Sequence, residues 1–124
     1  LEKTIIEIQK FFNKKINIVF GCGGDRDHQK RKAMGKIVYK LCNKIYITDD
    51  NPRFESAKKI RMQIKAGCPN AIVIPSRKMA IKNSISSLNE EILLIAGKGH
   101  EEFQLIKNKK IAISDHYCVT RYLK

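Results

Sequence analysis

The chain has no hydrophobic run long enough to cross a membrane, no closely spaced cysteine pair and few acidic residues. A membrane-spanning helix needs about 18 consecutive apolar residues, and no stretch of the 124 residues approaches that length. The N-terminus begins with a charged amphipathic segment, which is not the pattern of a signal peptide. These absences predict a cytoplasmic protein that has no membrane partner.

The four cysteines are far apart in the sequence and form no Cys-x-x-Cys motif: Cys22, Cys42, Cys68 and Cys118. This spacing argues against a zinc site and a disulfide framework, and it favours reduced thiols. Cys22 is close to His28 in the sequence, which could indicate a catalytic nucleophile and its base. No third group that would orient the histidine is evident. We therefore interpret Cys22 as a small buried thiol and predict no catalytic residue and no metal site.

Acidic residues are outnumbered, with 12 Asp and Glu against 25 Lys and Arg, so the net charge is +13. Such an excess raises the possibility of nucleic-acid binding. The lysines are scattered through nearly every segment, however, and no basic patch interleaved with aromatic residues is present. We interpret the charge as a solvated basic surface. A basic module that binds nucleic acid or anionic metabolites without catalysis is the alternative.

Apolar runs and amphipathic stretches alternate along the chain, and 43% of the residues are hydrophobic, which suits one compact domain. Helices are predicted at 1–13, 30–41, 55–66 and 77–88, and strands at 17–20, 45–48, 71–74 and 92–96. A hairpin of 103–106 and 111–113 and a last helix over 114–122 follow. This order predicts an α/β fold with a mostly parallel sheet, flanking helices and a C-terminal edge hairpin.

The first helix is predicted from the spacing of Leu1, Ile5, Ile8 and Phe12, with Ile6 and Phe11 widening the apolar stripe. The stripe begins at the first residue with no capping residue before it. We therefore expect the chain to be part of a longer protein.

The segment Asp49 to Arg53 directly follows a predicted strand. Pro52 disfavours helical geometry at Asn51, so Asp50 and Arg53 are expected on a stiff loop. Arg53 would bind a carboxylate and Asp50 an ammonium group of one ligand. The alternative is a solvated turn whose charges only keep it soluble.

Three loops are expected to meet, because ligands of open α/β sheets bind beyond the carboxyl ends of the strands. These loops are 21–30, 49–53 and 97–101. They pool Arg26 and Arg53 with Asp50 and Glu101, which suits a zwitterion better than a polyanion. Gly97-Lys98-Gly99 does not fit the phosphate-binding motif Gly-x-x-x-x-Gly-Lys-Ser/Thr, and the role of His100 in this loop stays open.

Three motifs, each after a predicted strand, carry a resemblance: 20–27 (Phe-Gly-Cys-Gly-Gly-Asp-Arg-Asp), 50–53 (Asp-Asn-Pro-Arg) and 96–101 (Ala-Gly-Lys-Gly-His-Glu). In this order they resemble the C-terminal domain of the Mur ligases, of the MurE type, over essentially the whole chain. The resemblance implies a Rossmann-like fold. It also implies that residues 1–124 form one amino-acid-binding domain, the last part of a three-domain enzyme.

The implied reaction is the ATP-dependent addition of meso-2,6-diaminopimelate to UDP-N-acetylmuramoyl-L-alanyl-D-glutamate through an acyl phosphate, in peptidoglycan synthesis. ATP and Mg²⁺ would be bound mainly by domains absent from this chain, so the isolated domain is expected to be inactive. Lysine-adding relatives depart from the second motif at the position of Arg53. The resemblance implies these residues for diaminopimelate: Arg26, Asp50, Asn51, Pro52, Arg53, Gly97 and Glu101.

The chain departs from the family pattern after Asp27, where the family has a glycine followed by Lys-Arg-Pro. Here residues 28–32 read His-Gln-Lys-Arg-Lys, which predicts a looser loop and a shifted helix start. A third hypothesis is an interaction domain of the same fold with no retained activity.

Overall fold

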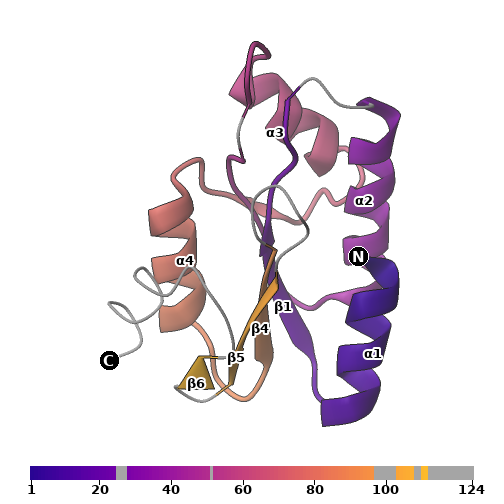
Figure 1. The fold of residues 1–124 in the computed structure, drawn as a ribbon, viewed down its shortest axis with the longest axis vertical. Helices are drawn as coiled ribbons and strands as arrows, with labels where there is room; N and C mark the ends of the chain where they lie inside the picture. The colour runs from indigo at the N-terminus through magenta and orange to yellow at the C-terminus, as the bar shows by residue number, and fades with distance from the viewer. Residues whose placement is uncertain (25–27, 51, 97–102, 108–109, 112–124) are drawn as a thin grey trace.

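The strands among the described residues form one six-stranded sheet in the order β3-β2-β1-β4-β5-β6. The structure is a computed structural model that describes residues 1–24, 28–50, 52–96, 103–107 and 110–111 (Figure 1). β1 pairs in parallel with β2 and β4, and β2 pairs in parallel with β3. β5 pairs antiparallel with β4 and β6. The strands are β1 (Ile16–Phe20), β2 (Ile45–Ile47), β3 (Ile72–Val73), β4 (Ile92–Ala96), β5 (Phe103–Lys107) and β6 (Lys110–Ile111).

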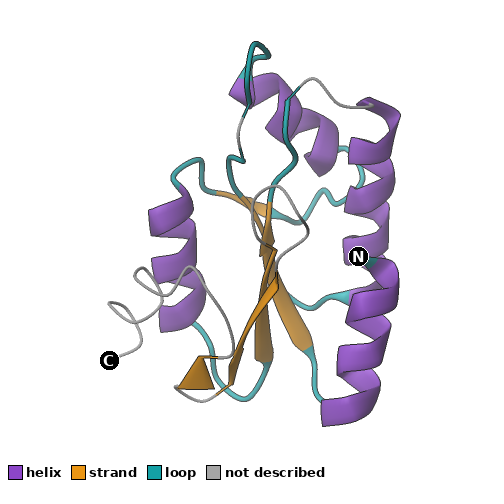
Figure 2. Cartoon of the chain, viewed as in Figure 1, coloured by secondary structure: helices purple, strands orange, loops and turns teal. Residues whose placement is uncertain are grey.

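Helices cover both faces of the sheet, as Figures 1 and 2 show, with α1 and α2 on one side and α4 on the other. The described helices are α1 (Glu2–Phe12), α2 (His28–Leu41), α3 (Ala57–Lys65) and α4 (Arg77–Ser86). This arrangement confirms the predicted α/β fold with an edge hairpin. Within the described residues, none of these helices combines the length and the apolar character needed to cross a bilayer.

Two hydrophobic clusters form the core because successive strand residues point to opposite faces. Ile18 and Phe20 of β1 pack with Ile5 of α1 and Ile64 of α3. Val19 of the same strand packs on the other face, in the cluster that includes α4. Ile92 to Ile95 of β4 are all buried, as expected for a strand covered on both sides.

The ends of the helices differ by a few residues from the prediction. α3 starts at Ala57 instead of 55, because Ser56 is its N-cap and the Ser56 hydroxyl accepts a bond from the Lys59 N–H at 3.3 Å. Glu55 therefore lies in the preceding loop. α2 begins at His28 rather than at 30, and α4 ends at Ser86 rather than at 88. The predicted helix over 114–122 lies outside the described residues.

Two predictions of burial are wrong. Phe11 was expected to widen the apolar stripe of α1, but its side chain is 83% exposed. At about 3.6 residues per turn, it lies roughly a quarter turn away from the stripe that holds Ile5 and Phe12. The apolar spacing within 30–41 also predicts Ala33 on the inner face of that helix, together with Val38. Ala33 is instead exposed, because Arg31, Gly35 and Val38 form the inner face of α2.

Helices α2 and α3 approach each other closely at two glycines. A Cβ atom at Gly35 would lie 2.2 Å from the carbonyl oxygen of Ile64, and one at Gly67 would lie 2.3 Å from that of Lys32. No side chain fits in these spaces. The contact fixes the two helices relative to each other, one turn away from Arg31 on α2.

Candidate functional site

The loops that follow β1 and β2 leave the sheet at the same edge and touch each other through their backbones. A Cβ atom at Gly21 would lie 2.3 Å from the Thr48 carbonyl oxygen. One at Gly24 would lie 1.7 Å from the Pro52 carbonyl oxygen. Glycine is therefore required at both positions, and two of the three loops predicted to meet are in contact.

Arg53 joins these two loops through its side chain. Its Nη1 atom donates a hydrogen bond of 2.6 Å to the carbonyl oxygen of Gly24. The backbone of Arg53 has a φ of 53°, an uncommon value for a residue other than glycine. A turn bond from the Glu55 N–H to the Pro52 carbonyl oxygen, 3.0 Å long, closes this part of the loop.

Arg31 connects four segments from a buried position on α2, where it is 1% exposed. Its two Nη atoms bind the two carboxylate oxygens of Glu55, each at 2.9 Å. Nη2 also donates to the Gly23 carbonyl oxygen at 3.0 Å, and Nη1 to the Gln63 side chain at 2.7 Å. The fork of the guanidinium group suits such a bidentate pair. His28 Nε2 lies 3.3 Å from the same carboxylate of Glu55.

Further bonds connect the β2 loop to its neighbours. Asp49 pairs with Arg61 of α3 at 2.5 Å. The β2 loop is also bonded to the loop after β3. The Thr48 hydroxyl and the Asp49 backbone N–H each donate a hydrogen bond to the Pro75 carbonyl oxygen. Arg77 Nη2 donates to the carbonyl oxygen of Ala96, the last residue of β4, at 2.7 Å. These bonds connect the β2 loop to α3 and to the loop after β3, and they connect α4 to the end of β4.

Three of the seven predicted ligand-binding residues lie in the described part of this edge. Asp50 and Pro52 are half-buried and Arg53 is exposed, all on the loop that contacts the glycine loop. The role of these three residues stays a prediction. The other four lie outside the described residues: Arg26, Asn51, Gly97 and Glu101.

Cys22 and His28 do not form a nucleophile-base pair in the described structure. The Cys22 thiol contacts Met34 Sδ at 3.7 Å, while His28 faces Glu55. Burial raises the pKa of Cys22 to about 11, with Arg31 lowering it and Asp50 raising it to a smaller extent. The thiol is therefore protonated at neutral pH, although Cys22 is partly buried and not the fully buried residue that the sequence predicted.

The sequence prediction missed Arg31 and Glu55. The available signal was that Arg31 shares a helical face with Gly35 and Val38, at intervals of four and three residues. A charged residue on an otherwise inward face indicates a buried ion pair. The partner, Glu55, was placed in a helix by its pattern, and only the cap at Ser56 shows that it belongs to the loop.

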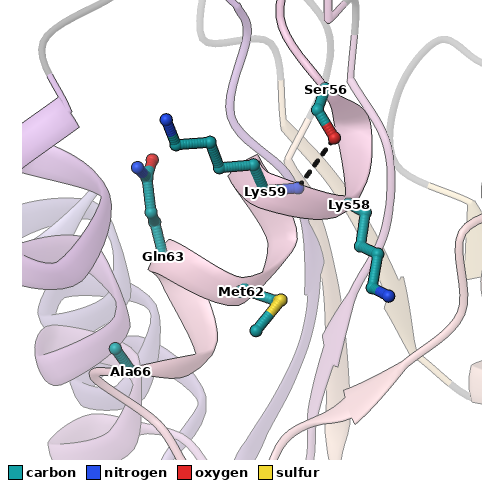
Figure 3. A pocket seen from close by; sticks show the side chains of 6 residues that line it. All are labelled: Ser56, Lys58, Lys59, Met62, Gln63 and Ala66. Atoms are coloured by element: carbon teal, nitrogen blue, oxygen red, sulfur yellow. Dashed lines mark hydrogen bonds between the residues drawn. The ribbon is translucent and has the colours of Figure 1, made fainter.

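A shallow hollow of about 430 Å³ lies on the exposed side of α3 (Figure 3). Figure 3 shows Lys58 and Lys59 pointing in different directions from this helix, with Met62 between them. Its other lining residues are Ser56, Gln63 and Ala66. Neither Asp50 nor Arg53 lines it, and its one link to the bonds at the carboxyl edge among its lining residues is Gln63, which binds Arg31.

Residues 1–99 match the family described as "Mur ligase, glutamate ligase domain". The chain belongs to this family, which confirms the resemblance predicted from the three motifs.

Curated relatives carry the name UDP-N-acetylmuramoyl-L-alanyl-D-glutamate--2,6-diaminopimelate ligase. The protein of Rickettsia prowazekii (strain Madrid E) is 49% identical over 128 residues, which cover 99% of this chain and 27% of the relative. The protein of Wigglesworthia glossinidia brevipalpis is 49% identical over 127 residues, which cover 99% of this chain and 26% of the relative. A solved structure whose title names the same ligase matches this chain with a TM-score of 0.76 and 30% sequence identity. The match covers 98% of this chain and 27% of the chain in that structure. The chain thus spans about a quarter of the length of these relatives.

Proposed function

We propose that this chain is the amino-acid-binding domain of an ATP-dependent ligase of peptidoglycan synthesis. The ligase would add meso-2,6-diaminopimelate to UDP-N-acetylmuramoyl-L-alanyl-D-glutamate. Family membership and the names of the relatives at 49% identity support this proposal. Because the chain spans only 27% of the Rickettsia relative, residues 1–124 would be one domain of a longer enzyme.

The observation that carries the proposal is the contact between the Asp50–Arg53 loop and the glycine loop. Diaminopimelate carries two carboxylates and two amino groups, so its site needs both positive and negative groups. Arg53 and Asp50 offer one of each on a loop that is bonded to its neighbours. On the sequence prediction, the site is completed by Arg26, Asn51, Pro52, Gly97 and Glu101.

This domain would position the amino acid, and it would not bind the nucleotide by itself. The sequence has no Gly-x-x-x-x-Gly-Lys-Ser/Thr motif. The described residues include no group of three His, Cys, Asp or Glu side chains placed to hold a metal ion. These residues do not fit ATP and Mg²⁺, so we assign the binding of both mainly to the rest of the ligase. Holding the amine in a reactive position is a contribution to catalysis that needs no proton transfer by this chain.

Calorimetry with the full-length protein tests this function. We expect meso-diaminopimelate to bind more tightly than L-lysine, which lacks the second carboxylate. Arg53→Ala should weaken diaminopimelate binding by about 2 kcal/mol, or roughly thirtyfold, because hydrogen bonds to a charged group are lost.

Lys58→Ala is the matched control, since it removes one positive charge from exposed α3 and should leave the affinity unchanged. Equal affinity for L-lysine, or an Arg53→Ala variant that binds normally, would contradict the proposal. Salt-sensitive binding of DNA or RNA in place of diaminopimelate would support the alternative basic module.

A further inference from the structure

We propose that Arg31 and Glu55 form a positioning clamp for the amino acid, which acts by fixing two loops relative to each other before the substrate binds. The loops are the glycine loop, Gly21–Gly24, and the β2 loop, Thr48–Glu55. Neither Arg31 nor Glu55 is among the residues predicted to touch diaminopimelate. The inference rests on the proposed function and adds to it two residues that control the site indirectly.

Arg31 binds groups on several segments that are far apart in the sequence. It binds Glu55 at the end of the β2 loop, the carbonyl oxygen of Gly23 in the glycine loop and Gln63 of α3. A guanidinium group that is 1% exposed is costly to bury unless such partners satisfy it. All three partners lie on other segments, so the energy of these contacts depends on how those segments are arranged.

Two arginines bind consecutive carbonyl groups of the glycine loop. Arg31 Nη2 binds the Gly23 oxygen at 3.0 Å, and Arg53 Nη1 binds the Gly24 oxygen at 2.6 Å. Arg53 belongs to the β2 loop, and Arg31 reaches that loop through Glu55. The two loops are therefore joined twice. Arg53, before Phe54, binds the glycine loop directly, and Glu55, after Phe54, is joined to it through Arg31 of α2.

Hydrophobic burial does not anchor the part of the β2 loop around Arg53. Phe54, which lies between Arg53 and Glu55, is 99% exposed. The bonds of its two neighbours hold the segment in place instead. Polar bonds are directional, whereas apolar contacts tolerate small shifts, so a clamp of this kind sets the position of Arg53 closely.

The clamp has a rigid base. Arg31 lies one turn before Gly35, where α2 packs against the backbone of α3 with no room for a side chain. Gln63, the α3 partner of Arg31, precedes Ile64, whose carbonyl oxygen forms this close contact. Movement of Arg31 relative to α3 is therefore restricted from two sides.

Steady-state kinetics of the full-length ligase test the clamp with two variants. Glu55→Gln keeps the size of the side chain and removes the charge, so the bidentate pair with Arg31 is weakened. We expect the KM for meso-diaminopimelate to rise about tenfold or more, since small misplacements of positioning groups have effects of this size. The KM for ATP should not change.

The double variant Arg31→Met with Glu55→Leu separates positioning from stability. Replacing a buried ion pair by apolar side chains of similar size is often neutral or stabilising, so the Tm should stay near that of the unaltered protein. The bond to the Gly23 oxygen is still absent, so the KM for diaminopimelate should remain high. Ile16→Val, at the opposite end of β1, is the control for a small loss of packing and should leave this KM unchanged.

The outcomes distinguish the clamp from the proposed function. If the unaltered protein neither binds nor ligates diaminopimelate, the proposed function is wrong and the clamp has no substrate to position. If the unaltered protein is active but Glu55→Gln has a normal KM for the amino acid, only the clamp is wrong. A double variant with a normal Tm and a normal KM would show that the bonds between Arg31 and Glu55 are not needed to position the amino acid, and it would overturn the clamp. Should the double variant fail to fold, the result for Glu55→Gln alone decides.

Discussion

The central strands and the loops at their carboxyl ends are stabilised in different ways. Around β1 and β4, aliphatic side chains such as Ile18 and Leu94 are fully buried and pack against helices. At the carboxyl edge, arginine side chains and close backbone contacts join the loops. Packing stabilises the sheet without demanding an exact orientation of each side chain, whereas the bonds at the edge fix individual groups. We therefore expect mutations in the two regions to have different effects on stability and on binding.

Truncation in the centre of the sheet should have the largest effect on stability. Leu94→Ala removes a fully buried side chain from β4 and should lower the free energy of unfolding by about 2–5 kcal/mol, because it leaves a cavity. Urea denaturation measures this change. Ile72→Ala on β3 is the matched comparison: its side chain is 47% exposed, so about 1 kcal/mol is expected. Equal losses in the free energy of unfolding for the two variants would mean that burial does not distinguish the central strand from the edge strand.

A methyl group at the contact between the two loops should affect binding more than stability. In Gly24→Ala the new Cβ would overlap the Pro52 carbonyl oxygen, so the loops must separate. We expect a loss of about 1–3 kcal/mol in stability, as for other overpacked sites, together with loss of diaminopimelate binding in calorimetry.

The control for this prediction is Ile92→Val, which removes a methyl group from a fully buried side chain at the first residue of β4, away from the carboxyl edge of the sheet. It should lower stability to a similar extent, while binding measured well below the Tm should persist. Parallel losses of binding in both variants would contradict a specific role for the loop contact.

The smallest expected effect concerns the cysteines of the two regions. Burial raises the pKa of both thiols, to about 11 for Cys22 at the glycine loop and to about 12 for Cys42 at the end of α2. Only Cys22 is also influenced by charged groups, with Arg31 lowering its pKa. Alkylation by iodoacetamide between pH 8 and 11, followed by peptide mass spectrometry, should therefore label Cys22 at lower pH than Cys42.

The same pKa shifts have a consequence for stability. Because the folded-state pKa values lie above the ordinary value of 9.0, the folded state holds its thiol protons more tightly than the unfolded state. The resulting stabilisation is complete below pH 9 and is lost as the pH rises toward 11 and 12. Labelling of Cys42 before Cys22 would contradict the assignment of Arg31 as a nearby positive charge.

The order of strands and helices was predictable, because apolar periodicity records which side chains face the core. The pattern did not distinguish an edge strand from a central one. Residues 71–74 form an apolar run like that of β4, yet Ile72 and Val73 are partly exposed, since β3 pairs with β2 alone among the described strands. An apolar run shows that a strand exists, while its exposure depends on which neighbours cover it.

The candidate site was predictable only in its location and in the charges on its surface. The chain order placed Asp50 and Arg53 beyond a strand end, and the structure agrees with this location. The bonds beneath the site were not predictable, because Arg31 and Glu55 are separated in sequence and meet only when α2 and the β2 loop are folded. Long-range ion pairs of this kind leave no local pattern.

The position of β4 in the sheet also determines the order in which the protein can assemble. β1 is synthesised early, but one of its two neighbours, β4, lies beyond α2, β2, α3, β3 and α4 in the sequence. A nascent chain that ends before Ile92 would leave one edge of β1 unpaired and its aliphatic side chains only partly covered. Such non-local pairing slows folding and exposes the unfinished sheet to aggregation. We therefore expect the first half of the chain to stay incompletely folded until β4 has been synthesised.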